Sequence, residues 1–319
     1  MAAVLNTNAA SLYASKNLQA AQSKMANSVE RLSSGLRINR AKDDAAGLGI
    51  ANALTQQING ANQGVRNLND GISMVQTAEG AIAAAQEMGQ RILTLATQGA
   101  NGTLGTTERT AIQSEMRQLI VAINSIGGRT KFSGNSLLSN MGNASGTAFS
   151  LQVSNNTTDV ISLGVGAFKN IGIGYSGATG TTAGTITSTT DYGNGTLTAE
   201  TSGQASILIN KINDTNLTVT SGSTSATAFQ AVQTAANTFI TNLSTQRSLL
   251  GAYQGQIEFT VSNVNELSSN LSAARSNVQD TDYASETASL TKGQILQQAA
   301  TAMLAQANQM PNVILSLLK

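Results

Sequence analysis

The side chains that could do chemistry in this 319-residue sequence are mainly carboxylates, amines, guanidinium groups and hydroxyls, because it contains no His and no Cys. Without these two residue types the chain cannot build a Ser-His-Asp triad, a thiolate nucleophile or an ordinary zinc site. Paired carboxylates or a lysine remain as candidates, and the 17 acidic and 18 basic residues form no cluster that suggests either. We therefore predict that the chain is not an enzyme and has no catalytic, cofactor-binding or metal-binding residues.

One group of charged residues is dense enough to need an interpretation. It consists of Arg37, Arg40, Lys42, Asp43 and Asp44. In one interpretation this segment is a solvated turn between two helices. In the other it is a connector whose charges pair with neighbouring subunits, since mixed charges at fixed positions set the register of an interface. The sequence leaves both interpretations open.

The overall composition excludes several classes of partner. A net charge of +1 does not attract nucleic acid or an anionic membrane surface. No stretch of the sequence approaches the ~20 apolar residues that a membrane span needs. The first residues lack the pattern of a cleaved signal peptide, so we expect a cytoplasmic chain or one exported without cleavage. Without Cys, stability does not depend on disulfides.

The sequence divides into three zones, and their composition predicts the secondary structure that positions the charged and polar side chains. Residues 1–130 and 226–319 have a helical composition, whereas Thr, Ser, Gly and Asn dominate residues 141–234. Both helical zones carry apolar stripes spaced by three and four residues, the second of them as a seven-residue repeat. A stripe of this kind is often an ordinary core-facing helix, but here both chain ends carry one and aromatics are only 3%. We therefore favour pairing of the ends with each other or with neighbouring subunits. The stripes are Met25, Val29, Leu32 and Leu36, and Leu296, Ala300, Met303, Ala307, Met310, Ile314 and Leu317.

The middle of the sequence predicts β-structure. Apolar residues alternate with polar ones at 149–153 and again at 161–165, on either side of a polar turn. This pattern is typical of a β-hairpin with one buried face. Residues 166–225 favour short strands and loops, with a disordered linker as the alternative. The fold class expected is α+β.

Glycine and proline predict where the helices are weak. The N-terminal helical zone contains seven glycines between residues 47 and 89, each costing a helix roughly 1 kcal/mol relative to Ala. We expect close packing to hold such a helix. Gly127–Gly128 predicts a helix stop, and Pro311 predicts a bend or local break in the last helix.

Two long segments resemble the two ends of bacterial flagellins. The first runs Ser33-Ser34-Gly35-Leu36-Arg37-Ile38-Asn39 and continues through Asp43-Asp44-Ala45-Ala46-Gly47. The second includes Ala274-Arg275-Ser276, Asp280-Thr281-Asp282-Tyr283 and the run Gln294–Gln309. The resemblance covers roughly residues 1–165 and 226–319, and the middle resembles no family.

The resemblance implies a structural subunit of the extracellular flagellar filament, the propeller for swimming, exported by the flagellar type III apparatus. It implies a terminal coiled coil of residues 1–42 and 280–319 that orders on polymerisation. It further implies a helical rod of residues 43–165 and 226–279 braced by the β-hairpin, and a variable, β-rich surface domain of residues 166–225. The implied partners are further copies of the chain, the export apparatus, an export chaperone, and the cap and hook–filament junction proteins.

A third resemblance concerns a surface patch. Gln90, Arg91, Leu95, Gln98 and Glu115 are similar to the patch that animal Toll-like receptor 5 reads on many flagellins, a patch that also makes filament contacts. The sequence departs from it at positions 93, 94 and 97, where Leu, Thr and Thr replace the Arg, Glu and Val typical of activating members. Two alternative functions stay open at this point: a hook–filament junction protein, and an adhesive or glycan-binding role of the outer domain.

Overall fold

The computed structural model describes residues 8–138, 148–164, 167–169, 171, 211–212 and 222–317, with the side chains of the last range described over 226–309. These residues form long helices and a few short antiparallel strands, which confirms the α+β class. The chain divides into two compact units, Met1–Asn59 with Leu267–Lys319, and Gly60–Glu266.

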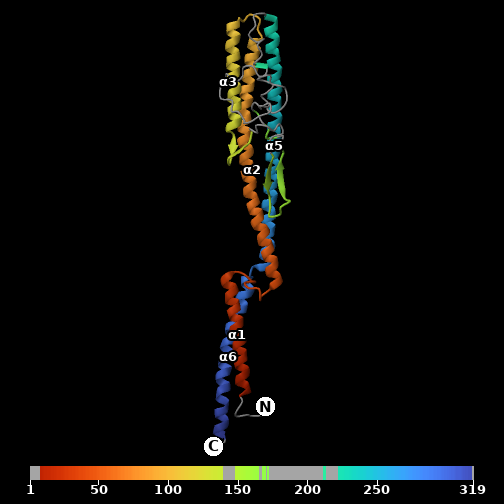
Figure 1. Cartoon of the computed structure of the whole chain (residues 1–319). Helices are drawn as coiled ribbons and strands as arrows, with labels where there is room; N and C mark the ends of the chain where they lie inside the picture. Colours follow the sequence, from red (N-terminus) through yellow and green to blue (C-terminus); the bar gives the residue numbers. More distant parts are fainter. Residues whose placement is uncertain are drawn as a thin grey trace, which may run out of the picture. The chain divides into compact units, whose positions relative to one another are not determined.

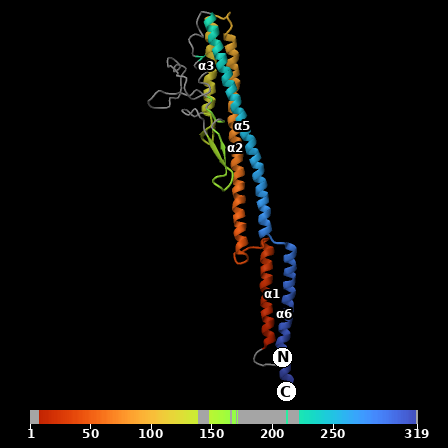
Figure 2. The ribbon, with the colours of Figure 1, turned by 90° about the vertical axis from the view of Figure 1, so that its right-hand side faces the viewer.

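The first unit is dominated by two helices from opposite ends of the sequence. Helix α1 (Ala9–Ser34) and helix α6 (Tyr283–Leu317) lie side by side (Figures 1 and 2). Asn8 caps α1 by accepting a hydrogen bond from the Ser11 backbone N–H at 3.1 Å. Gly35 ends α1 in the left-handed conformation, with φ of 73°.

The structure differs from two sequence predictions for these helices, although it does not test the bend predicted at Pro311. Leu36 does not extend the helical stripe, because the chain has already turned at Gly35 and Leu36 instead forms a β-bridge with Asp280. The helical backbone of α6 continues through Pro311 to Leu317, so the predicted local break is absent. A proline deletes one donor from the hydrogen-bond ladder, and the remaining bonds of a 35-residue helix can keep it helical.

The second unit packs parts of helices α2 (Ala45–Gly99) and α5 (Gly222–Gln279) with helix α3 (Thr106–Arg129), as Figure 1 shows. Its core combines aliphatic side chains with three fully buried phenylalanines, Phe168, Phe229 and Phe239. The predicted stop at Gly127–Gly128 is confirmed to within two residues, since α3 ends at Arg129.

The predicted hairpin is confirmed. Strand β3 (Phe149–Gln152) pairs antiparallel with β4 (Val160–Leu163), with Leu151 opposite Ile161. Two side chains anchor it: Asn67 of α2 donates to the Gln152 carbonyl at 2.9 Å, and the Gly164 N–H donates to the Tyr253 hydroxyl of α5 at 3.0 Å.

Most of the α2 glycines are explained by this hairpin and by core aromatics. At Gly60 a Cβ would come 2.9 Å from the Asn155 backbone nitrogen, and at Gly64 it would overlap the Val153 carbonyl. Gly71 approaches Leu151, and Gly89 approaches Phe239. The expectation of close packing is confirmed at these sites and also at Gly47, beside Ile38. Gly49 and Gly80 face open space and take no part in this packing.

A second, very short hairpin was not predicted. Strands β1 (Lys131–Phe132) and β2 (Asn135–Ser136) are joined by Ser133 and Gly134, whose φ angles are 49° and 84°. Two central residues with positive φ are the requirement of a tight hairpin turn. The sequence signal was weak because serine rarely adopts this conformation.

Most of the predicted β-rich segment 166–225 lies outside the described residues. The described part contributes to the core of the second unit, where Ala167, Phe168, Ile171 and Ile212 are buried. Buried amides hold it there: Gln246 donates to the Ala167 carbonyl at 3.0 Å, and Gln113 to the Ile212 carbonyl at 2.7 Å.

Candidate functional site

The α1–α6 pair packs along a narrow seam with a seven-residue repeat on both helices. The side chains withdrawn from solvent recur at alternating intervals of three and four residues, as in a coiled coil. Many of them are small or polar, so the seam buries little apolar mass. They are Ser11, Ala14, Leu18, Ala21, Met25, Ser28 and Leu32 on α1, and Glu286, Leu290, Gly293, Gln297, Ala300, Leu304 and Ala307 on α6.

The seam includes only part of the predicted stripes. Met25, Leu32, Ala300 and Ala307 lie in it. Three larger apolar side chains lie outside, and their exposed fractions are 50% for Val29, 43% for Leu296 and 64% for Met303. The side chains of Met310, Ile314 and Leu317 are outside the described residues.

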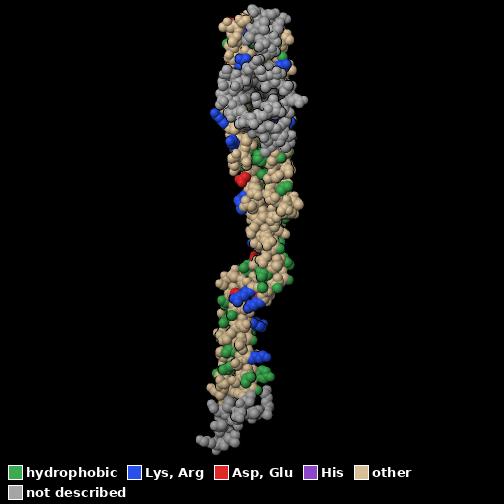
Figure 3. Space-filling view, in the orientation of Figure 1, with side chains coloured by type: hydrophobic (Ala, Val, Ile, Leu, Met, Phe, Trp, Pro, Cys, Tyr) green, Lys and Arg blue, Asp and Glu red, His purple; other side chains and the backbone are tan. Residues whose placement is uncertain are grey.

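Further large apolar side chains of this helix pair are exposed. Leu12, Tyr13 and Ile295 are 68%, 71% and 60% exposed. In the space-filling view such side chains appear along the surface of the pair, interspersed with Lys and Arg (Figure 3). Exposed apolar side chains in this density are typical of a surface that another protein covers.

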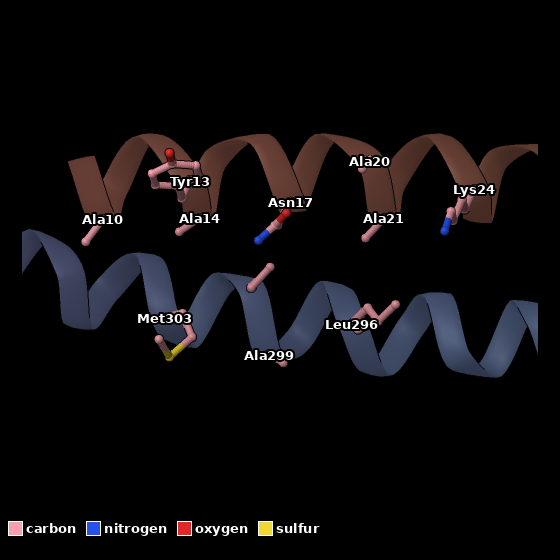
Figure 4. A pocket seen from close by; sticks show the side chains of 11 residues that line it. Ala10, Tyr13, Ala14, Asn17, Ala20, Ala21, Lys24, Leu296, Ala299 and Met303 are labelled. Carbon is pink, nitrogen blue, oxygen red and sulfur yellow. The ribbon is translucent and has the colours of Figure 1, made fainter. Parts of the chain in front are cut away.

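A shallow groove runs beside the seam. Small residues of α1 form one wall, and Ala10, Ala14 and Ala21 point toward α6 (Figure 4). Leu296 and Met303 of α6 line the groove, as does Tyr13 of α1. A groove with small residues on one wall and flexible apolar side chains on the other can accept a packed helix.

The segment after α1 is tied to the start of α6 by backbone hydrogen bonds. The Arg37 N–H donates to the Gln279 carbonyl at 2.6 Å, and the Thr281 N–H donates to the Gly35 carbonyl at 2.9 Å. The Arg37 guanidinium donates to the Val278 carbonyl at 2.6 Å. The two chain segments are therefore joined at this point.

Most of the predicted connector charges have partners within the chain. Arg40 pairs with Glu30 at 2.8 Å, an exposed pair of small energetic value. Asp44 caps α2 by accepting from the Gly47 N–H at 2.8 Å. Lys42 is exposed and forms no ion pair with any described residue. A pairing of these charges with other subunits stays a prediction.

Asp43 organises the turn before α2. Its carboxylate accepts from the backbone N–H of Arg40 at 2.9 Å and of Asn39 at 3.3 Å. The Arg40 hydrogen bond is the main cause that lowers the pKa of Asp43 below its usual value. The pKa of Asp43 is lower in the folded chain than in the unfolded chain. The ionised carboxylate therefore stabilises the fold at pH values above the unfolded pKa, and this stabilisation is lost as the pH falls through the folded pKa.

We expect acidification through the folded pKa of Asp43 to release the 39–43 turn. Hydrogen-exchange protection of the Arg40 amide should fall, because the protonated carboxyl is a weaker acceptor than the carboxylate. Asp43→Asn should show the same loss already at neutral pH, and Lys42→Gln, its exposed neighbour, should not. Unchanged protection in Asp43→Asn would show that the carboxylate does not hold the turn.

The receptor-like patch is only partly on the surface. Arg91 of α2 donates two hydrogen bonds to one oxygen of Glu115 on α3, at 3.0 and 2.7 Å. Gln90 and Gln98 are exposed. Leu95 is 2% exposed and packs in the core, so it cannot present its side chain to a partner.

Sequence reasoning missed Arg109. This side chain of α3 is 2% exposed and donates to the Asn101 carbonyl at 3.2 Å, while its Nε atom has no partner among the described residues. Nothing in the sequence around Arg109 distinguishes it from an exposed helical arginine. Its burial depends on how α3 folds back after the turn at residues 100–105.

Comparison with known proteins settles the family. Residues 5–143 match the bacterial flagellin N-terminal helical region, and residues 233–318 match the bacterial flagellin C-terminal helical region. The chain belongs to the bacterial flagellin family. It is 35% identical to polar flagellin F of Vibrio parahaemolyticus over 382 aligned residues, covering 100% of both chains. It is also 35% identical to the flagellin of Bacillus subtilis, covering 99% of both chains.

Flagellin structures have also been solved. The crystal structure of Bacillus cereus flagellin matches with a TM-score of 0.42 and 22% identity, covering 66% of this chain and 94% of that one.

Membership of the flagellin family gives this chain its function. It is a structural subunit that self-assembles into the extracellular flagellar filament, a motility structure. The alternative of a junction protein and that of an adhesin are not favoured, since flagellins match over the full length. No helix in the described part of the chain has the length and apolar character to cross a membrane.

Proposed function

We propose that the α1–α6 pair is the polymerising element of this flagellin and completes its packing only in the filament. The observation that carries this proposal is that several small and polar side chains lie between the two helices while large apolar side chains lie on the outside of the pair. Small and polar residues such as Ser28, Gly293 and Gln297 occupy the intrachain seam, while Leu296 and Met303 face outward.

The energetic consequence is a helix pair that is marginal alone. Isolated helices gain little stability in water, and half of the fourteen seam residues are Ala, Ser or Gly, so the seam adds limited apolar burial. Each large side chain buried by a neighbouring subunit contributes roughly 1.5–3 kcal/mol. Burial in the polymer then offsets the entropy cost of ordering the two helices. We infer that the pair is loosely structured in the monomer and ordered in the filament.

The chain as a whole follows the layered plan that its resemblance implies. Residues 1–42 and 280–319 form the inner layer of the filament, and residues 43–165 and 226–279 form the outer layer of its core. Residues 166–225 supply the variable surface domain, apart from Ala167, Phe168, Ile171 and Ile212, which are buried in the core of the second unit. The end of α1 at Ser34 and the start of α6 at Tyr283 are compatible with the inner boundaries at 42 and 280.

We infer that the chain has no catalytic activity. The absence of His and Cys from the whole sequence supports this, because it removes the usual bases, nucleophiles and metal ligands. A passive polymer needs none of them.

The remaining partners are proposed from family membership. They are the flagellar type III export apparatus, an export chaperone, and the cap and hook–filament junction proteins. For Toll-like receptor 5 we propose weak recognition at most. The exposed Arg91–Glu115 pair supports contact, whereas Leu93, Thr94 and Thr97 differ from activating members and the Leu95 side chain is buried.

The decisive experiment is seeded polymerisation of the full chain beside a variant lacking residues 280–319, read by negative-stain microscopy. We expect long filaments from the full chain and none from the truncated one, because the truncation removes the whole of α6. Filaments from the truncated chain would contradict the assignment of α6. A full chain that stays monomeric with protease-resistant ends would contradict ordering on assembly.

A further inference from the structure

The turn between α2 and α3 contains a reactive dipeptide. Asn101 and Gly102 are both exposed, and a Cβ on Gly102 would meet nothing within 4 Å. No hydrogen bond to another described residue is made by the Gly102 N–H. A backbone amide after an asparagine, free of partners and of a side chain, can attack the asparagine side chain.

The neighbouring backbone favours this attack. The Thr103 N–H donates to the side-chain oxygen of Asn101 at 3.2 Å. When the Gly102 nitrogen adds to Cγ of Asn101, negative charge develops on that same oxygen. A donor already directed at it stabilises the transition state as an oxyanion hole does.

The reaction exchanges one ammonia for one water and involves no oxidation. The Gly102 nitrogen loses its proton and bonds to Cγ of Asn101, and the side-chain nitrogen leaves as ammonia. This closes a succinimide ring. Water then adds to one of the two ring carbonyls, and the bond from that carbonyl carbon to the Gly102 nitrogen breaks.

Buried Arg109 lies beside one of the two carbonyls of the ring. It donates to the main-chain carbonyl of Asn101 at 3.2 Å. Water that adds to this carbonyl produces isoaspartate, and the former carbonyl becomes a free carboxylate beside the guanidinium. Arg109 has a partnerless Nε and no carboxylate within ion-pair distance among the described residues. A charge-assisted pair would satisfy this buried cation.

We propose that Asn101–Gly102 is a self-modification site that converts to isoaspartate, with its new carboxylate paired to Arg109. The reactants are the chain itself and water. The product lowers the formal net charge of +1 by one and adds a methylene group to the backbone of the α2–α3 turn. This chemistry is independent of the polymerisation proposal.

The chain contains its own control. Asn59–Gly60 is the same dipeptide inside α2, where the helical ladder engages the Gly60 N–H and Asn155 packs against Gly60. Asn59 should therefore be protected in the folded chain, although its local sequence is equally reactive. A third pair, Asn194–Gly195, lies outside the described residues.

The test is incubation of the full-length chain at mildly alkaline pH, followed by peptide mapping and an isoaspartate-specific methyl-transfer assay. We expect Asn101 to react at least about tenfold faster than Asn59, a barrier difference of about 1.4 kcal/mol. In chain unfolded by denaturant the two rates should converge. Gly102→Ala should slow the reaction at Asn101, because a methyl group hinders the attacking amide.

A second readout tests the role of Arg109. The ratio of isoaspartate to aspartate at residue 101 should be higher in the folded chain than in the unfolded chain. Arg109→Lys should lower it, while Arg91→Lys, a matched change elsewhere, should not. Equal rates at Asn59 and Asn101 in the folded chain would overturn the proposal that Asn101–Gly102 is a specific modification site. A product ratio unaffected by folding would overturn the role of Arg109, even if Arg109→Lys failed to fold.

Discussion

Gly64→Ala should lower the free energy of unfolding of the second unit by about 3 kcal/mol, the upper end of the usual cost of overpacking. An added Cβ would overlap the Val153 carbonyl, and that atom belongs to the backbone of the hairpin. A side chain can rotate away from a new methyl group, but a carbonyl can move only with its strand. The hairpin must then shift from α2, together with the hydrogen bond from Asn67 to Gln152.

Gly80→Ala should have the opposite effect and raise the free energy of unfolding. Gly80 lies in the same helix with open space around it, so Ala should stabilise α2 by about 1 kcal/mol through helix propensity. Urea unfolding of the full chain, followed by circular dichroism, measures both variants. If Gly64→Ala were as stable as the wild type, the close approach of the hairpin to α2 would be wrong.

The double substitution Leu296→Ser with Met303→Ser should raise the critical concentration for polymerisation about a hundredfold. Two exposed apolar side chains that become buried in the filament contribute about 3 kcal/mol together, which corresponds to that factor. The seam with α1 should be unaffected, because neither side chain lies in it. Sedimentation of polymer from seeded solutions at a series of concentrations gives the value.

A matched control separates lost burial from lost helix propensity. Gln294→Ser with Gln298→Ser changes two exposed polar residues of the same helix to the same residue type. It should leave the critical concentration nearly unchanged. Equal effects of the two double variants would mean that helix propensity, and not the apolar surface, limits assembly.

Contacts between distant segments could be predicted where each segment carries a clear apolar periodicity of its own. The seven-residue periodicity of the last helix and the stripe near the N-terminus predict paired ends, and α1 and α6 do pair. Alternation at 149–153 and 161–165 predicts the hairpin, because a strand with one buried face leaves that pattern in any sequence. The two flagellin-like segments are long enough to indicate the family from the sequence alone.

The side of each helix that faces its partner was less predictable. Apolar residues fit a core stripe and an intersubunit stripe equally well, so Leu296 and Ala300 looked alike in sequence. The structure separates them, since Ala300 is 8% exposed and Leu296 is 43% exposed. Only the packing of α1 against α6 shows that Ala300 lies in the seam while Leu296 lies outside it.

The amino-acid sequence was enough to establish the absence of His and Cys chemistry, the helical ends, the central hairpin and the flagellin family. The first three follow from composition and from local periodicities, whereas the family follows from the resemblance of the two terminal segments to flagellin ends. The folded chain was needed to show that the hairpin approaches Gly64 while Gly80 faces open space, and that Arg109 is buried against the Asn101 carbonyl. Such contacts join residues that are distant in the sequence, and the residues next to a glycine or an arginine do not indicate which atom will contact it.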